Sequence, residues 1–405
     1  MFNAAITGLG LVTPAGIGAD ANWGRLGAGG TAASRDAALS GLPVDFSCRV
    51  PDFDAVALLG RAAARRLDRF VQLAVVAARQ AVRSAGLDSS TWDGARVGVV
   101  LGNSLGGSAT TEEQHRAFLT NGPSDVSPLT VPKSMVNMVA GYVAIDCGAT
   151  GPSLVTATAC ASGATAVGIA RDLLRSGSCD IVLAGGTESA LTAATVTNLQ
   201  RMGALTSRVH DPAASSRPFD AARDGFTPAE GAGILVLERE EDARARGASV
   251  FACVSGYGAA SDAFHATQPH PSGAGVERAL RAALADAGVE PADIGHVNAH
   301  GTSTPLNDAT EALALTRVLG AGTPVTSTKG VTGHTLAAAG GIEAIYTALS
   351  LHHGVVPPTA NLESLDPAVE LDVVSGAPRA LRMKAAASTS LGFGGHNAAL
   401  VLTAV

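Results

Sequence analysis

The chain has 405 residues, of which 46% are hydrophobic and only 4% aromatic, and its formal net charge is −7. This length and apolar content support a large core in one or two domains. The acidic balance and the lack of a basic run exclude nucleic acid as an expected partner, and no apolar stretch is long enough to predict a membrane span. The five cysteines form neither a CxxC pair nor an even framework, so we expect a cytoplasmic protein without a metal site.

The first predicted strand, residues 4–14, runs into a glycine-rich turn. Gly8-Leu9-Gly10 has two of the three glycines of a dinucleotide-binding fingerprint, and Pro14 stands where the helix of that fingerprint would open, so nucleotide binding is not assigned. An alanine-rich helix is expected at 68–85, and a long excursion at 108–150 precedes the next strand.

The stretch 153–164 is the feature around which the chain is organised. Its first seven residues are small or β-branched and uncharged, which predicts a buried strand, and a helical spacing of apolar residues begins at Ala161. Cys160 is therefore expected where the strand meets the helix. Its thiol would face unpaired N–H groups of the first turn, which favours the thiolate. A buried structural cysteine is the alternative interpretation.

The pattern of the first half returns after about residue 250. Residues 254–258 resemble 6–10, and the helix expected at 276–289 resembles 74–87, because both end in Ala-Gly and an aliphatic residue. Residues 326–334 are followed by a small-residue helix and take the place of the Cys160 strand and helix. The chain is therefore expected to contain two similar halves.

We expect the halves to comprise residues 1–248 and 249–405 and to pack back to back. The predicted class is α/β, with five layers in which helices lie between two mixed sheets. Equivalent loops of the two halves would then meet on one face. This arrangement would bring Cys160, His300 and His334 together although 174 residues separate the first from the last.

One thiol and two imidazoles suit acyl transfer from a thioester followed by attack of a carbon nucleophile. His300 lies in a polar turn at a strand end, and His334 lies at a helix start that favours the neutral ring. Two neutral N–H donors aimed at one oxygen would stabilise an enolate. Lys329 adds a positive charge close by, and pairing with Glu343 would make burial of both less costly.

The segment 392–397, Gly-Phe-Gly-Gly-His-Asn, predicts a flexible loop with one aromatic side chain. It would supply a backbone N–H to an oxyanion hole and use Phe393 as a gate. His396 is expected to orient this loop. Four other histidines are interpreted as surface or loop residues, and the arginine group as a solvated face: His265, His270, His352 and His353; Arg65, Arg66 and Arg69.

The motifs 158–163, 298–305, 329–334 with 340–343, and 392–397 occur together. On these motifs, and over essentially its whole length, the chain resembles the elongating β-ketoacyl-acyl carrier protein synthases of the thiolase fold. The resemblance implies a thiolase-like αβαβα architecture built from two duplicated halves.

The resemblance also implies a reaction, decarboxylative Claisen condensation. Cys160 would take an acyl chain from a carrier protein, and His300 and His334 would hold the thioester carbonyl of malonyl-carrier protein as it loses carbon dioxide. The carbanion would attack the acyl-Cys160 thioester in a hole formed by the N–H groups of Cys160 and Phe393. Other implied site residues are Lys329 and Glu343, which support the histidines, and Thr302, Thr304 and Asn397.

The resemblance further implies partners. No cofactor is expected, because the phosphopantetheine arm belongs to the carrier. Members of this family are dimers, so the partner subunit would be an identical copy or a chain-length-factor-like subunit. Carrier docking is expected at Arg65, Arg66 and Arg208, which would meet an acidic carrier.

Three departures bear on the substrate. Pro228 and Ala229 stand in a loop where many fatty-acid members have other residues, and Thr111 replaces a larger apolar residue of the acyl channel. Thr130 replaces an aromatic residue near the dimer contact. A roomier, more polar channel favours a ketosynthase subunit of a type II polyketide synthase.

Three alternatives remain open. They are a housekeeping fatty-acid elongation enzyme, a non-catalytic subunit that shapes a chain-length pocket, and a thiolase that uses free coenzyme A. Cys160, His300 and His334 are all present, which weighs against the second. The third needs a cysteine near the C-terminal loop, and no cysteine follows Cys253.

Overall fold

Two sheets of the same strand order are joined along one edge in the computed structural model, which describes residues 2–405. The first sheet contains, in spatial order, β6 (Ser153–Thr156), β5 (Val97–Gly102), β7 (Ile181–Glu188), β8 (Gly231–Arg239) and β1 (Ala4–Thr13). The second contains β9 (Ala252–Ser261), β16 (His396–Thr403), β15 (Ala385–Gly392), β10 (Ile294–Asn298), β11 (Pro324–Thr326) and β13 (Asp372–Val373). Residues 4–6 of β1 pair antiparallel with residues 252–254 of β9, and this contact joins the sheets.

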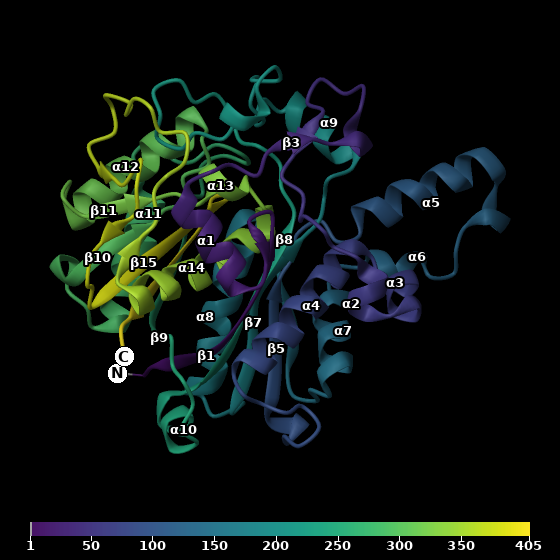
Figure 1. Cartoon of the computed structure of the whole chain (residues 1–405), viewed down its shortest axis with the longest axis horizontal. Coiled ribbons are helices and arrows are strands. Elements are labelled where there is room, and N and C mark those ends of the chain that lie inside the picture. The colour runs from purple at the N-terminus through teal and green to yellow at the C-terminus, as the bar shows by residue number, and fades with distance from the viewer. Residues whose placement is uncertain (1) are drawn as a thin grey trace.

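The pairing directions repeat as well as the order. β5 is parallel to β6 and β7, and β7 is antiparallel to β8. In the same way, β10 is parallel to β11 and β15, and β15 is antiparallel to β16. β1 and β9, which carry the similar segments 6–10 and 254–258, are neighbours at the junction (Figure 1). The predicted duplication into two mixed sheets is confirmed.

Two helices fill the space between the sheets, α8 (Ser162–Arg175) and α14 (Ala339–His353). They cross at very short range, because a Cβ on Gly163 would lie 2.5 Å from the backbone nitrogen of Gly341. A Cβ on Gly168 would lie 2.3 Å from the ring of Tyr257 in β9. Only glycine permits such contacts, which explains the small residues of both helices.

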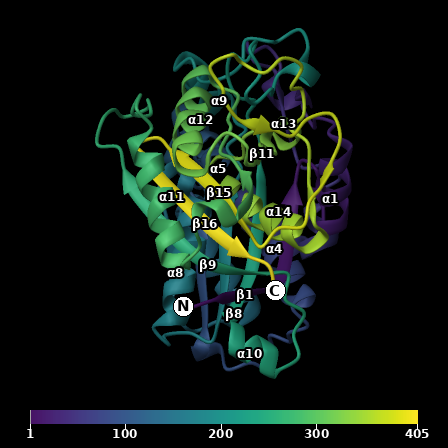
Figure 2. The same ribbon diagram turned by 90° about the vertical axis from the view of Figure 1, so that its left-hand side faces the viewer.

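The outer layers are also helical. α4 (Arg69–Ser84) and α7 (Met138–Cys147) cover the first sheet, and α11 (Ala274–Ala287) and α12 (Pro305–Leu319) lie along the second (Figure 2). The five predicted layers are therefore present. Gly8 and Gly10 belong to this packing, since a Cβ on either would overlap a carbonyl oxygen of α4.

The other elements are short or lie at the periphery. They are β2 (Gly16–Ile17), α1 (Ala19–Ala28), β3 (Ser34–Arg35), β4 (Phe46–Ser47), α2 (Ala55–Leu59), α3 (Arg61–Arg66), α5 (Ser108–Asn121), α6 (Thr130–Ser134), α9 (Ala193–Arg201), α10 (Glu240–Ala245), α13 (Lys329–Thr332), β12 (Val355–Val356) and β14 (Arg379–Ala380). Within residues 2–405, none of the helices combines the length and the apolar character needed to cross a bilayer.

The excursion at 108–150 is helical, and α5 and α6 extend from the body as an arm (Figure 1). Its surface carries large apolar side chains, among them Leu119, which is 69% exposed, and Val131, which is 60% exposed. Ile145 of α7 is 73% exposed, and Leu154 of β6 is 45% exposed. The prediction of a buried strand was wrong here: β6 is the free edge of the first sheet, so its first two residues are exposed.

Candidate active site

Cys160 lies in a strained turn between β6 and α8. The strand ends at Thr156, three residues earlier than predicted, and a single 3-10 turn at Ala159–Ala161 precedes the helix. Ala159 has a φ of 49°, a left-handed conformation that a non-glycine residue adopts only when its surroundings enforce it. This bend turns the Cys160 thiol toward the cavity instead of along the strand.

Side-chain hydroxyls enforce the bend. Ser162 Oγ donates to the Ala159 carbonyl at 2.6 Å and accepts the Thr158 N–H at 2.9 Å. Ser104, from the loop after β5, also donates to the Ala159 carbonyl at 3.2 Å. The conformation of the turn therefore depends on a loop that is distant in the sequence.

Burial raises the pKa of the Cys160 thiol to about 12, although the Lys329 charge and the Phe393 backbone N–H both lower it. The expectation that the helix start would favour the thiolate was wrong for this resting site. Desolvation disfavours the charged form more strongly than the nearby dipoles and charge stabilise it. The neutral thiol is therefore the favoured form of Cys160 at neutral pH.

Cys160, His300 and His334 meet in one cavity, as predicted. Their sulfur and ring-nitrogen atoms lie within 4.8 Å of one another, and all three residues are buried. The two imidazole rings are edge to face, with centroids 5.2 Å apart. The cavity has a volume of about 380 Å³, and its wall also includes Phe393 and Thr302. Three such ligand atoms also form a set that a metal ion can use, which the sequence pattern did not indicate.

The loop after β10 carries His300 and is fixed by an acidic residue of α12. Glu311 accepts the backbone N–H groups of His300 and Gly301, both at 2.8 Å, and it is fully buried. Sequence reasoning missed Glu311. The available signal was an acidic residue on the apolar, buried side of the helix that follows the His300 motif.

Both histidines are neutral. Burial and the Lys329 charge hold the pKa of His300 and that of His334 well below the usual value. The predicted neutral state is therefore present, but burial is its main cause. Lys329 Nζ donates to Glu343 in α14 and lies 3.4 Å from His300 Nδ1. Burial raises the pKa of Glu343 to about 7, although Lys329 opposes this.

The segment that departs from the fatty-acid pattern holds His334. The His334 N–H donates to the Thr227 carbonyl at 2.8 Å, and the Ala229 N–H donates to the His334 carbonyl at 3.1 Å. Pro228 is the residue between these two contacts, where no N–H is required. The Phe226 ring packs edge-on against the His334 ring at 5.1 Å. His334 Nδ1 is buried and has no hydrogen-bond partner within residues 2–405.

The loop at 392–397 lies directly over Cys160. A Cβ on Gly392 would lie 2.4 Å from the Thr158 carbonyl, so glycine is required for this approach. The Phe393 N–H points toward the Cys160 sulfur. Asn397 donates to Asp262 at 2.9 Å and to the Gly395 carbonyl at 3.1 Å, which ties the loop to the end of β9.

The remaining predicted residues lie at the cavity mouth or on the surface. Thr302 and Thr304 line the cavity, with hydroxyls 2.9 Å apart. Thr111 and Thr130 lie on the arm, and the cavity lining does not include them. Arg65 and Arg66 are exposed on α3, whereas Arg208 is half-buried and donates to the Ala222 carbonyl at 2.9 Å.

Arg69 is not the solvated residue that the sequence predicted. It donates through two nitrogens to Glu230, which is fully buried, at 2.8 and 2.6 Å. His265, His352 and His353 are exposed and His270 is half-buried, in agreement with their interpretation as loop and surface residues. His396 is exposed at the start of β16.

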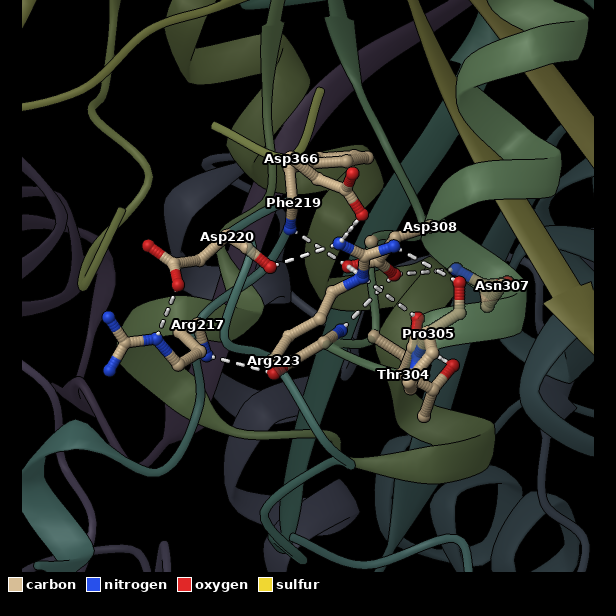
Figure 3. A network of polar contacts seen from close by, with 12 residues as sticks. Arg217, Phe219, Asp220, Arg223, Thr304, Pro305, Asn307, Asp308 and Asp366 are labelled. Atoms are coloured by element: carbon tan, nitrogen blue, oxygen red, sulfur yellow. Dashed lines mark hydrogen bonds and ion pairs between the residues drawn. The ribbon is translucent and has the colours of Figure 1, made fainter. Parts of the chain in front are cut away.

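Sequence reasoning also missed a buried polar network behind the His300 loop. Arg223 and Asp308 are its centre, and both contact the backbone of the loop or of the adjoining segment (Figure 3). A second missed residue is Glu188, which accepts N–H groups from Ser104 and Leu105 and so fixes the loop that supports the Cys160 turn. Burial raises the pKa of Glu188 to about 8.

Residues 2–243 match the family model "Beta-ketoacyl synthase, N-terminal domain", and residues 251–363 match "Beta-ketoacyl synthase, C-terminal domain". The chain is 43% identical over 400 residues to 3-oxoacyl-acyl-carrier-protein synthase 2 of Synechocystis sp., covering 98% of this chain and 96% of the relative.

Two solved structures are similar over the whole chain. The ishigamide ketosynthase/chain length factor has a TM-score of 0.93 and 34% identity, with 100% of this chain and 99% of the other covered. A type II PKS acyl-carrier protein in complex with its ketosynthase bound to the hexaketide has a TM-score of 0.91 and 32% identity, with both chains covered fully. The chain therefore belongs to the beta-ketoacyl synthase family of condensing acyltransferases.

Proposed function

We propose that the chain joins a malonyl unit to a Cys160-bound acyl chain by decarboxylative condensation, with both substrates delivered as thioesters of a carrier protein. The observation that carries this proposal is the buried cluster of one thiol and two neutral imidazoles. A buried sulfur nucleophile next to uncharged N–H donors suits transfer between thioesters, because no step leaves a stable charge in the cavity.

The first step loads the enzyme. The Cys160 sulfur attacks the acyl thioester carbonyl, the carbonyl–sulfur bond to the carrier breaks, and the thiol proton of Cys160 leaves with the carrier thiolate. The N–H groups of Cys160 and Phe393 stabilise the oxyanion. The raised pKa of Cys160 makes this proton movement part of loading.

The second step generates the carbon nucleophile. His300 and His334 donate N–H groups to the malonyl thioester oxygen, the carboxylate leaves as carbon dioxide, and its bonding electrons form the enolate. Neutral rings suit this role, since they stabilise the oxyanion without donating a full proton to it. Lys329, paired with Glu343, keeps His300 neutral and in position.

The third step forms the carbon–carbon bond. The enolate carbon attacks the acyl-Cys160 carbonyl, and collapse of the oxyanion breaks the carbonyl–sulfur bond and releases the Cys160 thiolate, which takes up a proton from solvent. The 3-oxoacyl product leaves on the carrier. Phe393 gates the acyl side, and Asn397 orients its loop through Asp262.

The substrate arm is held at the cavity mouth. Thr302 and Thr304 present a hydroxyl pair that can bind an amide of the phosphopantetheine arm. The chemistry requires no metal, nucleotide or other resident cofactor. We place the enzyme in the cytoplasm, where its five unpaired, buried cysteines remain reduced.

The carrier protein and the second subunit bind to surfaces outside the cavity. Arg65, Arg66 and Arg208 receive the acidic carrier. The apolar arm and the free edge of β6 receive a second subunit, either a copy of this chain or a chain-length-factor-like subunit. That subunit closes the acyl channel over Thr111 and Thr130. The two halves divide at residues 248 and 249, between α10 and β9.

The acyl chain has two candidate classes. Threonines at 111 and 130 favour polyketide or other oxygen-bearing chains. The 43% identity to 3-oxoacyl-acyl-carrier-protein synthase 2 favours housekeeping elongation of plain fatty-acid chains. Competition between the two acyl classes for Cys160 separates them, and exclusive loading of plain saturated chains excludes the first.

The mass of the intact protein tests the proposal. After incubation with candidate acyl-carriers, we expect a thioester adduct that maps to Cys160 and is absent in Cys160→Ala. The loaded protein should then release carbon dioxide and a 3-oxoacyl product from malonyl-carrier. Unchanged condensation by Cys160→Ala would exclude this function.

A further inference from the structure

The backbone of the loop 299–305 adopts a conformation that its own residues do not favour. Gly301 has a φ of 36° and Ser303 a φ of 71°, both in the left-handed region. The side chains of His300, Thr302 and Thr304, which lie before, between and after these two bends, reach the cavity. The left-handed region is unfavourable for a non-glycine residue such as Ser303, so neighbouring groups must impose the conformation.

Three buried charged residues impose it, each on a different part of the loop. Glu311 accepts the N–H groups of His300 and Gly301, and Asp308 accepts the N–H of Ser303 at 3.2 Å. From the loop itself, these two carboxylates accept only N–H groups. The carbonyl groups at the end of the loop are left to a cation, Arg223, which donates to Thr304 at 3.3 Å through Nε and to Pro305 at 3.1 Å through Nη2.

Arg223 is itself fixed from three sides. Its Nη1 donates to an Asp366 carboxylate oxygen at 2.6 Å and to the Asp220 carbonyl at 3.0 Å, and its Nε lies 3.6 Å from the buried carboxylate of Asp308. Figure 3 shows the guanidinium in the centre of this network. The residue is 7% exposed. The planar fork reaches several acceptors at once, which an ammonium group on a lysine cannot reproduce.

We propose that Arg223 is a positioning residue that sets the Thr302–Thr304 hydroxyl pair to hold an amide of the incoming pantetheine arm. The proposal rests on the proposed function, which delivers substrates on such an arm. An amide offers one donor and one acceptor, and two hydroxyls in contact can match both. Because Arg223 holds the carbonyl of Thr304, loss of its fork displaces the residue that carries one of the two hydroxyls.

A change at Arg223 should displace Thr304 without displacing His300. Glu311 holds His300 on the other side of the Ser303 bend, and Arg223 has no hydrogen bond to residues 299–303. A change at Arg223 therefore acts on arm binding more than on decarboxylation. For full-length substrates it should raise KM more than it lowers kcat.

The test compares two thioesters of one acyl group, a pantetheine thioester and an S-ethyl thioester that lacks both amides. The initial rate of Cys160 acylation is followed by intact mass for each. Wild type should prefer the pantetheine thioester, and Arg223→Lys should reduce that preference by about tenfold. An unchanged preference in a folded Arg223→Lys protein overturns the inference.

Two further variants exclude a general structural effect. Thr302→Val with Thr304→Val should lose the same preference, and adding Arg223→Lys should cause no additional loss. Arg246→Lys is the matched control, since Arg246 also joins a carboxylate and a backbone carbonyl but lies outside the cavity lining. Its preference should equal that of wild type. An additive loss, or an equal loss in the control, overturns the inference.

Folding is checked by circular dichroism. Should Arg223→Lys fail to fold, Asp366→Asn takes its place, because it removes one ion-pair partner of Arg223 and keeps the guanidinium. A smaller loss of preference for the pantetheine thioester in Asp366→Asn supports the inference. An unchanged preference overturns it. Wild type that loads neither thioester contradicts the proposed function and the inference with it. Normal loading with an unchanged preference in the variants contradicts the inference alone.

Discussion

Equivalent strands of the two halves lie in different surroundings. β6 forms the free edge of the first sheet, and its Leu154 is 45% exposed. β11 takes the corresponding place in the second sheet but is covered by β13, and its Val325 is 1% exposed. Each strand leads toward a central helix, and each connection carries site residues, Cys160 in one half and His334 in the other.

The difference separates two tasks. The first half carries Cys160 and keeps an open sheet edge and an apolar arm, which a second subunit can cover. The second half is closed, and its burial fixes the neutral state of His300 and His334. The open edge and the apolar arm thus belong to the first half, and the two neutral imidazoles belong to the second. Four predictions test this division.

The largest effect is expected in the closed half. His334→Ala should reduce release of carbon dioxide from malonyl-carrier by about 10²- to 10⁴-fold, because it removes one donor to the developing oxyanion. Acylation of Cys160 in the same sample, followed by intact mass, is the control and should persist. Decarboxylation at the wild-type rate would contradict the assignment of this half.

The open half should be sensitive to charge at its edge. Ile145→Glu with Leu154→Glu should weaken subunit association by about a hundredfold, because the carboxylates would be buried without partners. Light scattering after size exclusion should show the mass falling toward the 40.3 kDa of one chain. Leu313→Glu, which places a carboxylate at an exposed apolar position of α12, should leave association intact. An unaffected dimer in the double variant would place the interface elsewhere.

The pH dependence of stability should reveal Glu188. Its pKa is about 8 in the folded chain and near 4.5 when unfolded, so between these values the folded state keeps a proton that the unfolded state has lost. The free energy of unfolding contributed by Glu188 is thus complete below pH 4.5 and decreases as pH rises to 8. The slope is about 1.4 kcal/mol per pH unit at most.

Urea unfolding of wild type and Glu188→Gln across this pH range isolates the contribution, because the difference between the two proteins cancels the other groups. The variant should lack the slope. Parallel pH profiles would show that Glu188 is ionised in the folded protein.

The smallest effect is expected for Thr111, which lies on α5 of the apolar arm. Thr111→Ile exchanges a hydroxyl for an ethyl group and should shift competitive loading of Cys160 toward plain saturated chains by about tenfold or less. Thr120→Ile on the same helix is the matched control, since Thr120 is also exposed. Equal shifts in both variants, or none in either, would remove Thr111 from the acyl channel.

Local sequence determined much of this protein. The segments 6–10 and 254–258 predicted the duplication, because the two halves repeat the same strand-to-helix geometry. The glycines of α8 and α14 permit the close crossing of these two helices, since a larger residue would overlap the facing backbone. The Cys160, His300 and His334 motifs predicted a shared cavity, because each stands at the end of an element whose place follows from the repeat.

Only the tertiary structure decided the state of these groups. The pKa of Cys160 depends on burial by segments from both halves, and no local pattern measures that burial. The ion pair of Arg69 with Glu230 and the clamp of Arg223 on the His300 loop join residues far apart in the chain. An arginine in a polar segment has the same sequence context whether it is solvated or buried, and its partners alone determine which.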